Sequence, residues 1–213
     1  MKKLVRRKDS LGKMKQLCVL GVLKTDLGIK IKEEMLEWLV PLYDVTTVEV
    51  DPPNNVEFEY PFLKKACEAS IDSEQPILYL HTKGAACNNQ TQPLVRKLWR
   101  HEFSTMHDLY FDTVSKFSEA VAVAPFTSLA NSICWFNGFV MNYAAAEQID
   151  NKLRIAIDRY WYEQKLLNEA RVNCIGMYHA ACNTPECAYD VFINNLIIAQ
   201  KHLIRDNALL STK

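Results

Sequence analysis

The residues best suited to chemistry follow the apolar segment Ile77–Leu80, in the run His81, Thr82, Lys83 and Gly84. A continuous apolar segment of this length predicts a strand that is buried on both faces. Ligands of open α/β sheets bind outside the carboxyl ends of the strands, so we expect an imidazole, a hydroxyl and an ammonium at a ligand-facing edge. The alternative is an ordinary loop between a strand and a helix, which also needs polar residues and a glycine.

Two earlier apolar segments end in polar residues of similar kind. The segment 17–23 ends at Lys24 and Thr25, and the β-branched segment 43–50 ends at Asp51. If these strands are parallel to the third one, their ends share one edge of the sheet, and we expect them to contact the nucleoside half of a nucleotide ligand. An aspartate that precedes two prolines is also a common turn residue, which is the alternative for Asp51.

The pattern of elements predicts a single-domain α/β fold. Strands over 17–23, 43–50 and 77–80 alternate with helical spacing over 29–39 and 58–70, which predicts a mainly parallel, Rossmann-like sheet flanked by helices. Further along, the sequence predicts a helix over 93–118, strands over 120–124 and 133–141, an alanine-rich helix from 143, and a helical last third from 154. We expect a basic leader (1–14), an α/β core (15–165) and a helical extension (166–213).

Three sequence features in this order resemble a family of small bacterial glycosyltransferase-like proteins. They are the His81-Thr82-Lys83-Gly84 run, the pair Trp99-Arg100 in the next helix, and the aromatic element 135–139 before an alanine-rich helix. The resemblance spans roughly residues 15–165. It departs from the family at Asn137-Gly138-Phe139-Val140, where the family pattern reads Gly-Asn-Phe-Trp.

The resemblance implies a glycosyltransferase A fold that moves a sugar from a nucleotide-sugar donor to a saccharide or lipid-linked acceptor during surface polysaccharide synthesis. It suggests acceptor contacts at the aromatic element and donor contacts at the strand ends and the following helix. The expected acceptor residues are Trp135, Asn137, Gly138 and Phe139, and the expected donor residues are Lys24, Thr25, Asp51, His81, Thr82, Lys83, Gly84 and Arg100.

No Asp-x-Asp motif occurs in the chain, although many enzymes of that fold hold a divalent metal with it. A protonated lysine cannot bind a metal, but it can place positive charge beside a diphosphate. We therefore favour a site without a metal cofactor, with Lys83 contacting the diphosphate and His81 as a hydrogen-bonding partner; a divalent metal such as Mn²⁺ or Mg²⁺ is the alternative. For Lys83 itself, a solvated lysine side chain is the alternative.

A catalytic base is expected in the segment 154–163, where Asp158 and Glu163 flank aromatic residues. An inverting sugar transferase needs a carboxylate to accept the proton of the acceptor hydroxyl, and neighbouring aromatics can stack on sugars. The resemblance favours Glu163, with Asp158 as the second choice. The alternative is an aromatic core segment with an ion pair between Arg159 and Glu163.

The last third contains Cys174, His179, Cys182 and Cys187, which are residue types that zinc prefers. Their spacing differs from common zinc units, and we expect buried thiols and no stoichiometric zinc. The seven cysteines of the chain favour reduced thiols in the cytoplasm over a disulfide framework.

Charge and hydropathy limit the partners. The chain of 213 residues has 25 basic and 25 acidic residues, which argues against a nucleic-acid-binding surface. No segment of the sequence is apolar enough to span a membrane, and the basic start suggests either peripheral contact with an anionic membrane surface or a solvated leader. A non-catalytic nucleotide-sugar or polysaccharide-binding protein of the same fold is the chief alternative function.

Overall fold

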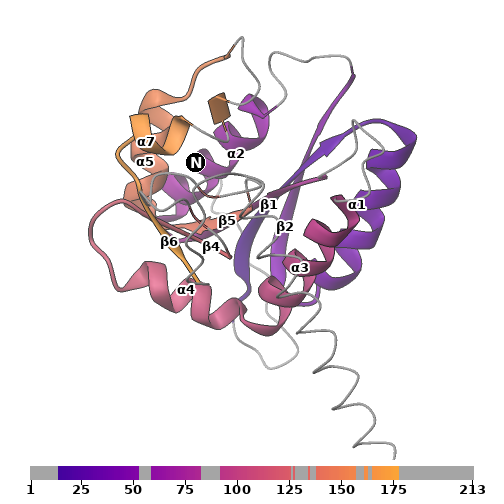
Figure 1. Cartoon of the computed structure of the whole chain (residues 1–213), viewed down its shortest axis with the longest axis horizontal. Coiled ribbons are helices and arrows are strands. Elements are labelled where there is room, and N and C mark those ends of the chain that lie inside the picture. Colours follow the sequence, from indigo (N-terminus) through magenta and orange to yellow (C-terminus); the bar gives the residue numbers. More distant parts are fainter. Residues whose placement is uncertain are drawn as a thin grey trace, which may run out of the picture.

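The computed structural model describes residues 14–52, 59–82, 92–125, 127, 134, 138–156, 161–162 and 165–177. Its centre is a six-stranded sheet in the order β2-β1-β3-β5-β4-β6. The strands are β1 (Gln16–Leu23), β2 (Tyr43–Val50), β3 (Ile77–His81), β4 (Val121–Ala124), β5 (Phe139–Met141) and β6 (Asn173–Gly176). Figure 1 shows helices on both sides of this sheet.

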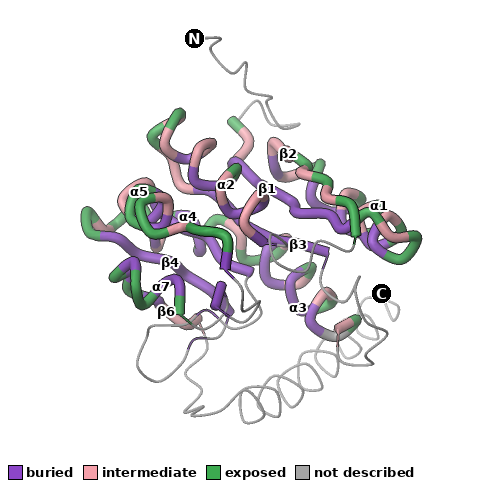
Figure 2. Tube along the Cα trace, turned by 90° about the horizontal axis from the view of Figure 1, so that it is seen from above, coloured by how far each residue is buried: buried purple, intermediate pink, exposed green. Residues whose placement is uncertain are grey.

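Each face of the sheet has its own apolar core. On the first face lie α1 (Asp26–Leu39), α3 (Gln92–Thr105) and α4 (His107–Ser115). On the second face lie α2 (Tyr60–Ser73), α5 (Tyr143–Lys152) and α7 (Leu166–Glu169). The central strands β1 and β3 alternate their side chains between these two cores, which explains why they read as continuous apolar segments. Figure 2 shows the buried strands between helices with exposed outer sides.

The expectation of a mainly parallel sheet is wrong, because the sheet is mixed. β1 pairs in parallel with β2 and β3, and β4 pairs in parallel with β6, but β5 is antiparallel to both of its neighbours. β5 lies between β3 and β4. Because it is antiparallel to both, β3 and β4 run in the same direction. The carboxyl ends of five strands and the amino end of β5 therefore lie at one edge of the sheet.

Two helical predictions also need correction. The helix expected over 93–118 is two helices, α3 and α4, which are separated at Met106. The last third is not wholly helical, since β6 is a strand that pairs with β4 and extends the sheet beyond residue 165. The expected helical residues from 178 onward lie outside the described part of the chain, as does the leader over 1–13.

Asn142 joins the connection between β5 and α5 to the start of β4. Its side-chain oxygen accepts hydrogen bonds from the N–H groups of Ala145 (3.0 Å) and Val121 (3.1 Å). Its amide nitrogen donates to the carbonyl oxygens of Phe117 (3.2 Å) and Glu119 (2.8 Å). This single buried side chain caps α5 and fixes the entry into β4.

Candidate active site at the carboxyl edge of the sheet

The ends of β2, β1 and β3 bring together polar residues that are far apart in the sequence. The register places Leu23 beside Val50 and Gly21 beside His81, so Asp51, Lys24 and Thr82 follow adjacent strands. The chain leaves β1 toward β2 with α1 on the first face and then crosses to β3 with α2 on the second face. Connections that depart in opposite directions mark the position where ligands bind in open α/β sheets.

Lys24 and Asp51 form the exposed part of this edge. The Lys24 Nζ atom lies 2.8 Å from the Asp51 Oδ1 atom, with side-chain exposures of 39% and 76%. The hydrogen bond to the Asp51 carboxylate, followed by its charge, raises the pKa of the Lys24 ammonium. Lys24 is therefore a permanent cation whose charge is already partly balanced, and an anionic ligand has to compete with Asp51 for it.

Thr82 is a buried link between β3 and β1. Its backbone N–H donates to the Gly21 oxygen (2.8 Å), and its hydroxyl oxygen accepts the Leu23 N–H (3.1 Å). The side chain has 3% exposure, so in this arrangement it positions the turn at Lys24 and does not face solvent. The structure thus gives Thr82 a supporting position at the expected site.

Removing the Thr82 hydroxyl should loosen this edge. We expect Thr82→Val to destabilise the protein by about 1 to 3 kcal/mol, because the buried Leu23 N–H loses its acceptor. Urea unfolding followed by circular dichroism measures the loss, and Thr82→Ser is the matched control that keeps the hydroxyl. Equal stability of the valine and serine variants would show that the hydrogen bond has no such role.

The turn from β1 into α1 is set by Thr25 and Gly28. Thr25 is the N-cap, and its side-chain oxygen accepts the Gly28 N–H at 2.9 Å. A Cβ atom added at Gly28 would lie 1.9 Å from the carbonyl oxygen of Leu23, so only glycine permits this close approach of helix and strand. Sequence reasoning missed Gly28, although a glycine in the first turn of a helix after a buried strand is a usable signal for such contact.

His81 is buried in an aromatic cluster at the same edge. Its side chain has 4% exposure, and its ring centroid lies 5.8 Å from that of Trp99 in an edge-on arrangement and 6.2 Å from that of Tyr79. Trp99 in turn covers Gly138, where an added Cβ would lie 2.4 Å from the indole ring. The structure therefore joins three separate expected motifs, those at His81, Trp99 and Gly138, through packing.

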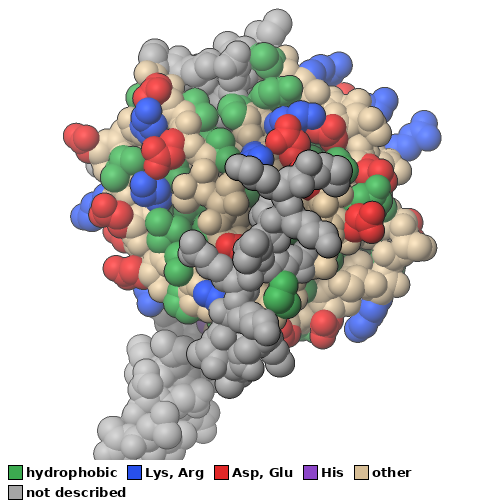
Figure 3. Space-filling model, turned by 180° about the vertical axis from the view of Figure 1, so that it is seen from behind, with side chains coloured by type: hydrophobic (Ala, Val, Ile, Leu, Met, Phe, Trp, Pro, Cys, Tyr) green, Lys and Arg blue, Asp and Glu red, His purple; other side chains and the backbone are tan. Residues whose placement is uncertain are grey.

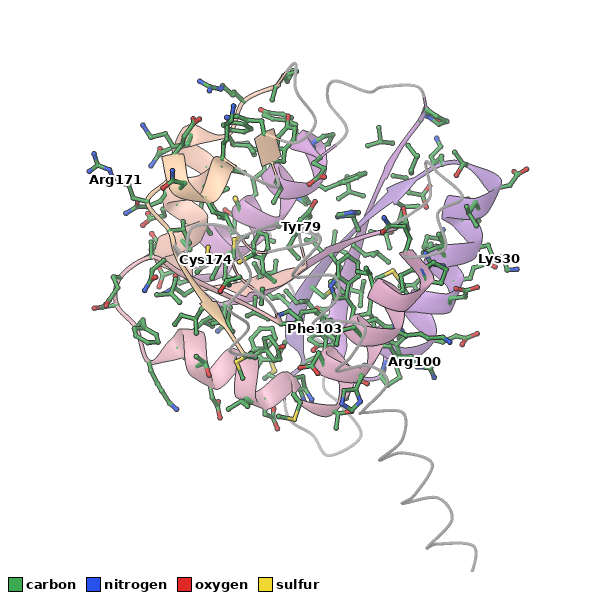
Figure 4. The ribbon with its side chains drawn as sticks, in the orientation of Figure 1. Lys30, Tyr79, Arg100, Phe103, Arg171 and Cys174 are labelled. Atoms are coloured by element: carbon green, nitrogen blue, oxygen red, sulfur yellow. The ribbon has the colours of Figure 1, made fainter. Side chains whose placement is uncertain are left out.

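Arg100 and Trp99 point in different directions from α3, as their adjacent positions predict. Trp99 has 1% exposure, whereas Arg100 is exposed. Figure 4 shows Arg100 at the periphery of the molecule, on the outer side of α3. This orientation gives no support to a direct phosphate contact by Arg100 in the structure as it stands.

Phe139, one of the expected acceptor residues, and the aromatics Trp161 and Tyr162 of the expected base segment belong to the second-face core. Phe139 packs against Tyr79 with ring centroids 5.5 Å apart and 1% exposure, so it is a core residue. Trp161 and Tyr162 have 5% and 2% exposure, and Trp161 Nε1 donates to Glu169 Oε1 at 3.0 Å. These two aromatics therefore do not form an exposed sugar platform, as the hypothesis for the base required.

Several predicted residues lie outside the described part of the chain. They are Lys83, Gly84, Trp135, Asn137, Asp158 and Glu163, together with His179, Cys182 and Cys187 of the cysteine-rich segment. Cys174 is described and is a buried strand residue of β6 that shares the second-face core with Cys134. Burial, and then a hydrogen bond with Cys174, raise the pKa of the Cys134 thiol, which keeps it protonated.

The surface carries charges of both signs. Figure 3 shows acidic and basic side chains interspersed over one face, with no extended region of a single sign among the coloured atoms. Among the helices that the structure describes, none has the length and apolar character to cross a bilayer. The described residues also contain no cluster of three or more histidine, cysteine or acidic side chains arranged to hold a metal ion.

Comparisons with known proteins identify no relative. No protein-family model, no curated protein and no solved structure gives a significant match to this chain. An assignment of function therefore rests on the geometry of this edge and on the sequence motifs of the chain.

Proposed function

We propose that the protein is a glycosyltransferase that uses a nucleotide-sugar donor, with a saccharide or lipid-linked acceptor, and that its fold is of the glycosyltransferase A type. The observation that carries the proposal is the convergence of Asp51, Lys24 and Thr82 at adjacent strand ends where the chain connections diverge. The resemblance of the His81-Thr82-Lys83-Gly84 run to a bacterial glycosyltransferase-like family supplies the reaction class.

The described side chains fit the nucleoside half of such a donor better than its diphosphate. Asp51 is exposed and carries carboxylate oxygens that can accept hydrogen bonds from ribose hydroxyls. Lys24 contributes one cation, but Asp51 and Asp26 contribute two nearby carboxylates, so this part of the edge has no excess of positive charge. We therefore assign the diphosphate to Lys83, which follows Thr82 in the sequence.

The two halves of the donor can be tested separately. We expect Lys83→Ala to weaken binding of a nucleoside diphosphate by about 1.5 to 3 kcal/mol, as for other charge-assisted contacts, and to leave binding of the nucleoside alone almost unchanged. Asp51→Asn should weaken the binding of both the nucleoside diphosphate and the nucleoside. Calorimetry with UDP, GDP and the matching nucleosides measures these affinities, and Lys30→Ala on the exposed side of α1 is the control for loss of a surface charge.

Metal dependence is part of the same prediction. We expect diphosphate binding to persist in EDTA. The sequence has no Asp-x-Asp motif to hold a metal, and Lys83 supplies the positive charge in its place. Affinity that disappears in EDTA, or that is the same in wild type and Lys83→Ala, would contradict the proposed donor site.

A non-catalytic binding protein is the second candidate. The observation that favours it is the burial of Phe139, Trp161 and Tyr162, which leaves no exposed aromatic platform among the described residues of the acceptor side. Donor binding without any hydrolysis or transfer of the sugar, tested over a panel of nucleotide sugars and acceptors, would favour this candidate over an enzyme.

A further inference from the structure

The outer edge of β2 is a regular strand edge without a partner among the described strands. β2 is the first strand in the sheet order and pairs only with β1, over the whole length from Tyr43 to Val50. It contains no proline or lysine, which commonly protect such an edge, and its charged side chains are the two acidic residues Asp44 and Glu49. Its residues from Asp44 onward are half-buried or exposed. An edge of this kind is a template for another strand.

The direction of the free backbone groups follows from the ladder with β1. The Lys24 N–H donates to the Val50 oxygen (2.9 Å), so Val50 directs its hydrogen-bonding groups toward β1. In a parallel ladder alternate residues do the same, and the residues between them point their N–H and C=O groups the other way. Val45, Thr47 and Glu49 therefore present these groups at the outer edge.

We propose that the protein forms a two-fold symmetric dimer in which β2 pairs antiparallel with β2 of a second copy, centred on Thr47. An antiparallel pair must join outward-pointing residues with outward-pointing residues, and centring on Thr47 satisfies this condition. Thr47 then exchanges its backbone hydrogen bonds with Thr47 of the second copy, and Val45 does so with Glu49. The result is one sheet that continues across both copies.

The side chains in this register select a second copy as the occupant. Asp44 lies opposite Val50, Thr46 opposite Val48, and Glu49 opposite Val45, so no like charges face each other directly. Thr47 faces Thr47, which is a favourable cross-strand pair. The Glu49 carboxylate also has its own partner within the chain, because Lys32 Nζ lies 2.9 Å from Glu49 Oε1.

The mass in solution tests this proposal. Light scattering with size-exclusion chromatography, over about 1 to 200 µM protein, should show a concentration-dependent shift from 24.5 kDa to twice that mass. Thr47→Pro should remain monomeric at the highest concentration, since it removes the outward N–H group while leaving every hydrogen bond to β1 in place. Thr47→Val keeps this N–H group, is the matched control, and should still form the dimer.

A second variant guards against misfolding of the proline variant. Thr47→Lys leaves the backbone unchanged and places two ammonium groups opposite each other at the symmetry axis, so it should also be monomeric, with wild-type circular dichroism and melting temperature. Wild-type protein that stays at 24.5 kDa over the whole range, or a dimer that persists in both Thr47→Pro and Thr47→Lys, would overturn the proposal.

Discussion

Replacing Asn142 with alanine is expected to lower the free energy of unfolding by about 2 to 4 kcal/mol, the largest effect on stability that we predict for a described residue. The change removes the N-cap of α5, which is typically worth about 1 kcal/mol, and it leaves the buried Val121 N–H without its acceptor, at a cost of about 1 to 3 kcal/mol. The carbonyl groups of Phe117 and Glu119 also lose a donor, but these hydrogen bonds are only partly buried, and water replaces the donor at the exposed Glu119. Urea unfolding measured by circular dichroism gives the loss.

Two further variants separate the parts of this network. Asn142→Asp keeps an oxygen that accepts from Ala145 and Val121, but its second oxygen faces the carbonyl oxygens of Phe117 and Glu119, so we expect an intermediate loss. Asn151→Ala, at an exposed position in the same helix, should change stability little. If Asn142→Ala and Asn151→Ala have equal effects, the network does not hold β4, β5 and α5 together as described.

The first half of the fold was predictable because β1 and β3 are continuous apolar runs, β2 is rich in β-branched residues, and each segment has a clear end. The prediction for β2 (43–50) agrees with the structure. The strand predicted over 17–23 begins one residue earlier in the structure, at Gln16. In this region apolar or β-branched segments alternate with segments of helical period, and proline residues such as Pro41 and Pro76 fall between several of them. The parallel pairing of β1, β2 and β3 follows from this alternation, because helical crossovers join parallel strands.

The direction of β5 was not predicted, since a strand of three apolar residues does not indicate whether it pairs parallel or antiparallel with its neighbours. The signal available in the sequence was the connection over 125–138, which lacks a helical period. A parallel connection between neighbouring strands usually needs a helix, whereas antiparallel neighbours can be joined by a loop. β6 was missed because its four residues include only two apolar side chains, Cys174 and Ile175, and belong to a strand only through their pairing with β4.

At the candidate site, the sequence predicted the edge but not the exposure of each side chain. Lys24 and Asp51 lie side by side at the ends of adjacent strands, as expected from their positions. Thr82 and His81 are buried because β3 runs one residue further than its apolar segment and Thr82 continues the hydrogen bonding to β1. The contact of Trp99 with Gly138 was not predictable from spacing, because it depends on how α3 packs over the reversed strand.

Glu163→Gln is expected to have the largest effect on turnover if the protein transfers sugar by inversion. The change keeps the size of the side chain but removes the group that accepts the proton of the acceptor hydroxyl, and general-base contributions are typically about 10² to 10⁴ in rate. The dissociation constant of the donor should stay the same, because the base contacts the acceptor. Glu163 lies outside the described residues, so the test is kinetic: single-turnover transfer, with donor binding measured on the same samples.

Glu169 provides the matched control from the same part of the chain. Its carboxylate accepts from Trp161 Nε1 (3.0 Å) and lies 3.3 Å from an Arg154 nitrogen, so Glu169→Gln should affect stability and leave turnover per folded molecule unchanged. If Glu163→Gln behaves like this control, lowering the melting temperature while turnover is preserved, then Glu163 is a structural residue paired with Arg159. Asp158→Asn would then be the next variant to test, and preserved turnover there as well would leave sugar transfer without a base in this segment and favour the binding-protein function.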